Sequence, residues 1–189
     1  LALLGWNPGT EREIFSLSQL IKEFSLKRIQ KGGAVFNIQR FDWINGFYIR
    51  QKSPEKLAEL CLPYLIGAGF VTPETVDMQT LTSIVALYQE RLKKLAEISE
   101  FTDFFFKKQL EYPKELLYWK DATDKQTKEM LKKLEPLISQ IREGEWAKEK
   151  LEQIIMPEAE KEKNRGYMLW PLRVALTGKK ASAGPFEIA

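Results

Sequence analysis

The residues best suited to bind a ligand lie near the carboxyl end of the sequence, where basic side chains outnumber acidic ones. From residue 161 onward the acidic residues are Glu162 and Glu187. The basic residues of this stretch are Lys161, Lys163, Arg165, Arg173, Lys179 and Lys180. Six cations against two carboxylates leave a local surplus of four, more than the net charge of +3 of the whole chain. Clustered positive charge attracts phosphates, so this stretch is the first candidate for a binding site.

Composition excludes several kinds of catalytic centre. The 189 residues include no histidine and a single cysteine, Cys61. A Ser-His-Asp or Cys-His centre, an imidazole-bound metal, a cysteine-based zinc site and an internal disulfide are therefore excluded. We expect no catalytic residue and no metal site in this chain, and Cys61 packed in the core. A lone cysteine fits a reducing, cytoplasmic compartment, and no apolar run is long enough to span a membrane.

The spacing of apolar residues predicts an all-α fold made of two helical subdomains, because no stretch alternates between apolar and polar residues. Capping signals mark the expected helix starts. These signals are Ser16 with Gln19, Asn37 before a helix over residues 38–51, Ser53 before Pro54, and Thr123 with Gln126. The clearest amphipathic pattern runs from Asp77 through Leu95 and predicts one helix, after which Ser99 caps the next.

Several expectations concern the second half of the chain. Phe101 and the run Phe104 to Phe106 are expected to pack in the core, because single-strand readers usually interleave aromatic with basic residues. A helix is expected to start at Trp146 and to end before Pro157. A further helix over residues 166–177 contains Pro171, which should bend it, and Gly178 should end it. The alternating charges of the helix after Thr123 predict a solvated face to which we assign no function.

Motifs at both ends of the chain resemble bacterial-type glutamyl-tRNA synthetase, in its stem-contact and anticodon-binding parts. At the carboxyl end they are Pro171-Leu-Arg-Val-Ala-Leu-Thr-Gly178, Ser182-Ala-Gly-Pro185 and Phe186-Glu-Ile188. At the amino end they are Leu1-Ala-Leu-Leu-Gly-Trp6, Arg12-Glu-Ile-Phe15, Phe41-Asp-Trp-Ile-Asn-Gly46 and Tyr48-Ile-Arg50. Two sets of motifs in the right order are more specific than one short pattern.

The resemblance implies the helical fold of the class I anticodon-binding type and a division at residue 70. Residues 1–70 would form the stem-contact region, and residues 71–189 the anticodon-binding domain, cut before its last helix. The parent enzyme attaches glutamate to tRNA with ATP and Mg²⁺, but this chain carries neither ATP-site signature. We therefore expect a monomeric piece without cofactors, whose partners are glutamate tRNA and a preceding catalytic domain.

The resemblance also implies which residues touch tRNA. Arg173 and the loop Ser182, Ala183, Gly184, Pro185 and Phe186 would contact the anticodon, through backbone groups and an apolar edge. The family often has proline where this chain has Ala183, so the loop is less rigid. Residues expected to contact the tRNA backbone are Lys179, Lys180, Arg165 and Arg50. A solvated helix end remains the alternative for Lys179 and Lys180.

Arg91 corresponds to the arginine that senses the third anticodon base in discriminating members of the family. Guanidinium groups only donate, so they can bond the O2 and N3 acceptors of cytosine but oppose the donors of guanine. Glutamate anticodons end in C and glutamine anticodons in G. A merely solvated Arg91 is the alternative. For the chain as a whole, two alternatives stay open: a helical adaptor for a protein partner, and a synthetase relative that no longer binds RNA.

Overall fold

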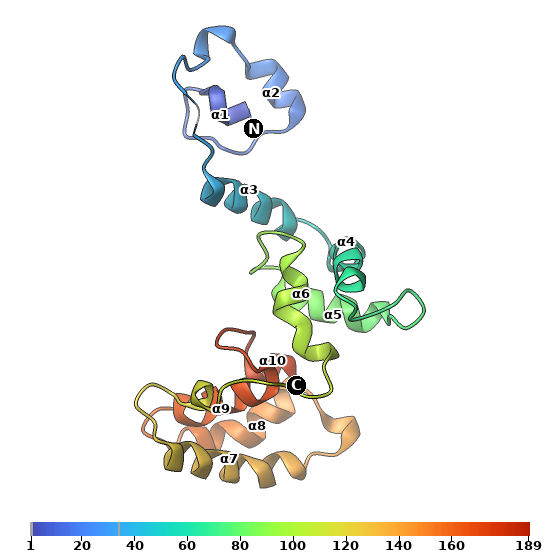
Figure 1. The fold of residues 1–189 in the computed structure, drawn as a ribbon, viewed down its shortest axis with the longest axis vertical. Helices are drawn as coiled ribbons and strands as arrows, with labels where there is room; N and C mark the ends of the chain where they lie inside the picture. Colours follow the sequence, from blue (N-terminus) through green and yellow to red (C-terminus); the bar gives the residue numbers. More distant parts are fainter. Residues whose placement is uncertain (1, 34) are drawn as a thin grey trace.

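The computed structural model describes residues 2–33 and 35–189, and these residues form an elongated all-helical molecule (Figure 1). The predicted all-α class is confirmed. The bounds of the first helices are α1 Ala2–Gly5, α2 Leu17–Glu23, the 3-10 helix η1 Leu26–Arg28 and α3 Ile38–Arg50. Those of the middle are α4 Pro54–Gly67, α5 Met78–Tyr88, α6 Glu97–Thr102 and η2 Asp103–Phe106. The remainder are η3 Lys114–Leu117, α7 Asp124–Ser139, η4 Glu143–Glu145, α8 Lys148–Ala159, α9 Gly166–Thr177 and α10 Pro185–Ile188.

Side-chain caps mark the starts of α2, α3, α4, α5 and α7, four of which the sequence predicted. Ser16 accepts a bond from the Gln19 amide, and the Gln19 side chain accepts one from the Ser16 amide, which completes a capping box. Thr123 and Gln126 form the same box at the start of α7. Asn37 caps α3 through the Arg40 amide. Each cap satisfies amides that the first helical turn leaves without a partner.

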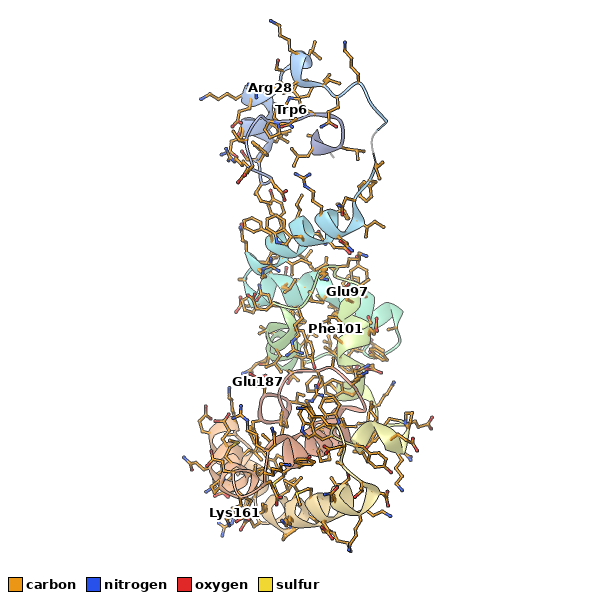
Figure 2. The ribbon with its side chains drawn as sticks, turned by 90° about the vertical axis from the view of Figure 1, so that its left-hand side faces the viewer. Trp6, Arg28, Glu97, Phe101, Lys161 and Glu187 are labelled. Carbon is orange, nitrogen blue, oxygen red and sulfur yellow. The ribbon has the colours of Figure 1, made fainter. Side chains whose placement is uncertain are left out.

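The amino-terminal end of the molecule packs around Trp6, which is 2% exposed. Its ring meets Phe15 edge-on with centroids 6.1 Å apart and also contacts Phe24 at 5.7 Å. An isolated bridge pairs Trp6 with Ile29. Trp6 and Arg28 lie at one end of the molecule and Lys161 at the other (Figure 2).

The first core cluster joins α4, α5 and α6. Its fully buried members include Leu57, Leu65 and Val85. The predicted packing role of the phenylalanines is confirmed, since Phe104 belongs to this cluster and Phe106 stacks on Phe70 at 5.4 Å. The other members that bear on the sequence predictions are Cys61, Phe101 and Phe105. Burial raises the pKa of the Cys61 thiol to about 11, so this cysteine packs rather than reacts.

The second core cluster joins α7, α8 and α9 at the carboxyl-terminal end. Leu134, Ile155 and Met168 are among its most buried side chains. Gly178 ends α9 in the left-handed conformation with φ +66°, as predicted. Ala183 belongs to the first cluster, so the segment after α9 returns to the middle of the molecule. The first cluster holds residues from both sides of residue 70, and the domain division at that residue stays a prediction.

The predicted helix from Asp77 through Leu95 is wrong in its second half, because α5 ends at Tyr88. Tertiary bonds explain the difference. The Gln89 side-chain amide donates to the carbonyls of Ile49, Arg50 and Lys52, at 3.1, 3.3 and 2.8 Å, which ties the chain to the end of α3. The Glu97 carboxylate then accepts the amides of residues 93 and 94, at 2.8 and 3.0 Å, and holds the turn that follows.

Three smaller predictions about helix ends are also wrong. Ser99 caps nothing, because its hydroxyl donates to the Tyr64 carbonyl at 3.1 Å and α6 already begins at Glu97. The helix expected at Trp146 begins at Lys148 instead. Pro157 lies inside that helix and does not end it. Ser99 is thus used for a tertiary bond, and Pro157 is tolerated within the helix.

No described helix is long and apolar enough to cross a lipid bilayer. Among the residues with assigned positions, no three side chains of the metal-binding types gather at one point.

Candidate nucleic-acid interface

Arg173 lies on α9 with its guanidinium only partly exposed. The guanidinium carbon lies 4.4 Å from the ring centroid of Trp170, and one N–H donates to the Lys180 carbonyl at 2.9 Å. Within residues 2–33 and 35–189 no carboxylate forms an ion pair with it. Burial, followed by the nearby charge of Arg91, lowers the pKa of Arg173. A guanidinium has five N–H donors, so donors remain for a ligand.

Arg91 lies in the turn that follows α5, rather than on the helix that the sequence predicted. Its guanidinium carbon is 5.9 Å from the centroid of the Tyr88 ring. In the part of the chain that the structure describes, it too forms no ion pair with a carboxylate. Positive charge on Arg91 and Arg173 attracts an electron-rich ligand, as clustered cations do at an anion-binding surface.

Tyr88 connects α5 to the loop after α9. Its ring is 1% exposed, and its hydroxyl accepts the Ala183 amide at 3.4 Å. Burial raises the pKa of Tyr88, although the Ala183 amide and both arginines oppose that rise. The hydroxyl is therefore neutral at physiological pH and serves as a fixed support for the site.

The loop of residues 182–186 is anchored on both core clusters. Ser182 and Ala183 are 7% and 1% exposed, and the Ser182 hydroxyl donates to the Ala183 carbonyl at 2.9 Å. Phe186 packs on the second cluster. The Gly184 amide donates to the Glu187 carboxylate at 2.9 Å, just before Pro185 opens α10. The side chains at 182, 183 and 186 thus hold the loop in place, and contact of this loop with RNA stays a prediction.

The four expected phosphate contacts lie in different settings. Lys180 and Arg165 are exposed near Arg173, without a carboxylate partner in the described residues. Lys179 is 24% exposed and its ammonium lies 2.7 Å from Asp103. Arg50, at the end of α3, lies 3.9 Å from the Glu90 carboxylate. Arg165 and Arg173 line the same groove beside α9, whereas Lys180 and Arg50 do not line it.

A groove of about 260 Å³ runs beside Arg173. Its apolar walls are Trp119, Leu169, Trp170 and Pro185, and Arg165 and Arg173 line it as well. The two indoles lie 5.0 Å apart at 44°, and the Trp170 N–H donates to the Leu116 carbonyl at 2.8 Å. Flat apolar surfaces flanked by guanidinium groups suit unstacked nucleotide bases, which offer a π-face and acceptor edges.

Sequence reasoning missed Tyr88, Trp119 and Trp170 as residues of the site. The two tryptophans are 51 positions apart, so no local pattern joins them. The signal that could have found Trp170 is its place three residues before Arg173, which is one helical turn.

A family model described as an anticodon binding domain matches residues 56–189, well over half of the chain. The chain belongs to the anticodon-binding domain family. The groove, Arg91, Arg173 and the loop of residues 182–186 all lie within the matched part of this domain.

Curated relatives give the same assignment over a longer stretch. The chain is 37% identical over 185 residues to a glutamate–tRNA ligase of Carboxydothermus hydrogenoformans, which covers 95% of the chain and 37% of the relative. It is 40% identical over 197 residues to that of Clostridium botulinum strain Okra, covering all of the chain and 38% of the relative. The anticodon-binding chain therefore spans less than two fifths of the length of these relatives.

A solved structure, that of a glutamate tRNA ligase from Elizabethkingia meningosepticum in complex with its amino acid, matches the whole chain. The TM-score is 0.79 at 26% identity, and the match covers 36% of that structure's chain. The resemblance to glutamyl-tRNA synthetase that the end motifs indicated is confirmed by these three findings.

Proposed function

We propose that this anticodon-binding domain is the part of a glutamate–tRNA ligase that holds the anticodon of glutamate tRNA. The observation that carries the proposal is the Arg173 guanidinium, which lines an aromatic groove beside Trp119 and Trp170 and forms no ion pair with a carboxylate in the described residues. The relatives are glutamate–tRNA ligases, which favours RNA over the protein partner of the adaptor alternative. On this proposal, ATP and Mg²⁺ act in the remainder of the ligase, and the protein works as a monomer in the cytoplasm.

Arg91 is proposed to read the third anticodon base. Its exposed guanidinium belongs to a turn whose backbone amides bond the Tyr88 carbonyl, at 2.8 Å for Arg91 and 3.1 Å for Leu92. A donor-only group that faces the O2 and N3 acceptors of cytosine meets the N1–H and N2–H donors of guanine at the same edge, which favours cytosine by about 1 to 3 kcal/mol.

Binding of a glutamate tRNA transcript across a salt series tests the function. We expect affinity to fall steeply as salt rises, because exposed cations near the groove replace counterions on the phosphates. Changing the third anticodon base from C to G should cost about 1 to 3 kcal/mol of binding free energy at fixed salt. Fluorescence anisotropy with labelled transcripts measures both effects. Weak binding that is indifferent to the anticodon would support the adaptor or the relative that has lost RNA binding.

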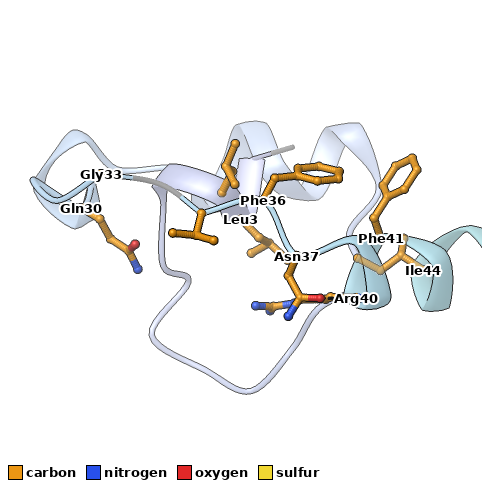
Figure 3. A pocket seen from close by; sticks show the side chains of 10 residues that line it. Leu3, Gln30, Gly33, Phe36, Asn37, Arg40, Phe41 and Ile44 are labelled. Carbon is orange, nitrogen blue, oxygen red and sulfur yellow. Dashed lines mark hydrogen bonds between the residues drawn. The ribbon is translucent and has the colours of Figure 1, made fainter.

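Many exposed apolar side chains lie toward the opposite end of the molecule, and this set is here called the upper apolar surface. Its most exposed members are Leu17 at 74%, Leu26 at 76% and Val35 at 88%. Its other members are Ile21, Phe24, Ile29, Phe36, Ile38, Phe41, Trp43 and Tyr48. A pocket of about 350 Å³ opens on it, with Leu3, Phe36, Phe41 and Ile44 in its wall (Figure 3). Apolar patches of this kind are typical of protein contacts.

We infer that the upper apolar surface contacts the remainder of the ligase. The relatives are more than twice as long as this chain, and the surface lies at the far end from α9 (Figure 1). It therefore leaves the groove free for tRNA.

Replacing Leu17 and Ile21 by serine is expected to weaken association with the separately produced remainder of the Carboxydothermus ligase by more than about tenfold. The reason is that burial of each apolar side chain would contribute roughly 1.5 kcal/mol or more to the binding free energy. Ile66→Ser, which removes a 37% exposed side chain of α4, is the matched control and should change little. Analytical ultracentrifugation of the mixture measures the association. Equal association of wild type and double variant would contradict the assignment.

A further inference from the structure

Asp103 connects the middle of the molecule to the loop that follows α9. It is the first residue of η2, and its side chain is 18% exposed. One carboxylate oxygen accepts a bond from Lys107 on the same turn. The other lies 2.7 Å from the Lys179 ammonium without the alignment of a hydrogen bond, so this contact is an ion pair.

The ion pair fixes a short loop of defined geometry. Gly178 turns the chain in the left-handed conformation, and the Lys179 amide donates to the Thr177 hydroxyl at 3.1 Å. The next residue, Lys180, presents its carbonyl to the Arg173 guanidinium at 2.9 Å. A chain of direct contacts thus runs from Asp103 through Lys179 and the Lys180 carbonyl to Arg173.

Burial alone would raise the pKa of Asp103, but the contacts with Lys107 and Lys179 outweigh it and leave the pKa below its ordinary value. The carboxylate is therefore charged at neutral pH and attracts Lys179 fully. A lysine held at 24% exposure against a carboxylate is a poor phosphate ligand, because it would have to leave that partner first.

We propose that Asp103 is a positioning residue for anticodon reading, which acts through Lys179 to hold the Lys180 carbonyl where it orients the Arg173 guanidinium. This proposal rests on the proposed function, because it assigns to Asp103 the orientation of Arg173, the side chain that would bind the anticodon. It also reassigns Lys179 from phosphate contact to tether. Arg173 stacked on Trp170 and bonded to one fixed carbonyl loses little rotational freedom when it binds a base.

The test compares Asp103→Asn and Lys179→Met with the wild type in two measurements. In the first, binding of glutamate tRNA is compared with binding of the same tRNA carrying a changed second anticodon base. Each variant is expected to lower this ratio of affinities by about two- to tenfold, the effect of losing one oriented hydrogen-bonding partner. The double variant should be no worse than either single variant, because both remove one contact. Asp103→Glu, which keeps the charge, should recover part of the ratio.

The salt dependence distinguishes a tether from a phosphate ligand. If Lys179 touched a phosphate, Lys179→Met would reduce the slope of log affinity against log salt by about one, as Lys180→Met is expected to do. We expect the slope of Lys179→Met to match the wild type. A reduced slope with an unchanged affinity ratio would overturn the proposal.

The second measurement needs no RNA. The NMR signal of the Arg173 Nε–H group, assigned with Arg173→Lys, should shift and broaden in Asp103→Asn while thermal unfolding shows the fold intact. Wild type that fails to discriminate anticodons would refute the proposed function, whereas an unchanged Arg173 signal in both variants would refute the tether. The two failures are thus distinguishable.

Discussion

Replacing Arg173 by alanine is expected to weaken binding of glutamate tRNA by about 1 to 3 kcal/mol, since a guanidinium that bonds a base edge through two donors contributes that much. The alanine variant loses the donors beside the groove and exposes the face of Trp170 on which the guanidinium now lies. The Lys180 carbonyl also loses its partner. Equilibrium binding at fixed salt measures the change, and no other single substitution at the site should cost more.

Two matched variants separate charge from geometry. Arg173→Lys keeps the positive charge but loses the planar fork, so it should restore the salt slope without restoring discrimination between anticodons. Lys132→Ala removes one charge from the outer face of α7, where the side chain is exposed, and should leave affinity nearly unchanged. Wild-type affinity in Arg173→Ala, or full recovery in Arg173→Lys, would contradict the role given to Arg173.

The second large effect is expected from Gly166→Ala, which should destabilise the domain by about 1 to 3 kcal/mol, the usual cost of overpacking a core. Gly166 is the first residue of α9, and an added Cβ would lie 2.4 to 2.8 Å from three atoms of the Trp119 ring. Alanine gains up to about 1 kcal/mol in helix propensity, but the rigid indole cannot move away as the tip of a flexible side chain would. The steric clash therefore outweighs the gain in helix propensity, and the net change in stability is unfavourable.

Gly67→Ala is the control for helix propensity. Gly67 is the last residue of α4, and an added Cβ there meets nothing within 4 Å. We expect unchanged or slightly raised stability in Gly67→Ala, and for Gly166→Ala a lower midpoint in urea together with altered tryptophan fluorescence. Because Trp119 lines the groove, Gly166→Ala should weaken tRNA binding as well. A Gly166→Ala variant as stable as the wild type would show that Trp119 is not fixed against α9.

The starts of the capped helices were predictable because their causes lie within a few residues. Ser16 with Gln19 and Thr123 with Gln126 satisfy the first amides of their own helices, and the structure contains both capping boxes. Gly178 ends α9 because it adopts positive φ at little steric cost. These interactions need no distant partner.

Two predictions about helix bounds were wrong because a side chain forms a hydrogen bond with a residue far away in the sequence. The pattern through Leu92 and Leu95 is helical in spacing, yet the chain turns after Tyr88 because Gln89 bonds carbonyls near residue 50. Serine is a common N-cap residue, but the Ser99 hydroxyl donates to the Tyr64 carbonyl on another helix. A hydrogen bond between residues more than thirty positions apart cannot be predicted from the pattern of about ten neighbouring residues.

The sequence by itself determined the all-α class, the main capped helix starts and the family, because these depend on local backbone chemistry and on long motifs. The tertiary structure alone decided that Trp119 meets Trp170 and that Lys179 is paired with Asp103. Each of these contacts joins residues at least 51 positions apart. Such pairs are brought together by the packing of two apolar cores and by the return of the chain after Gly178, which no local pattern specifies.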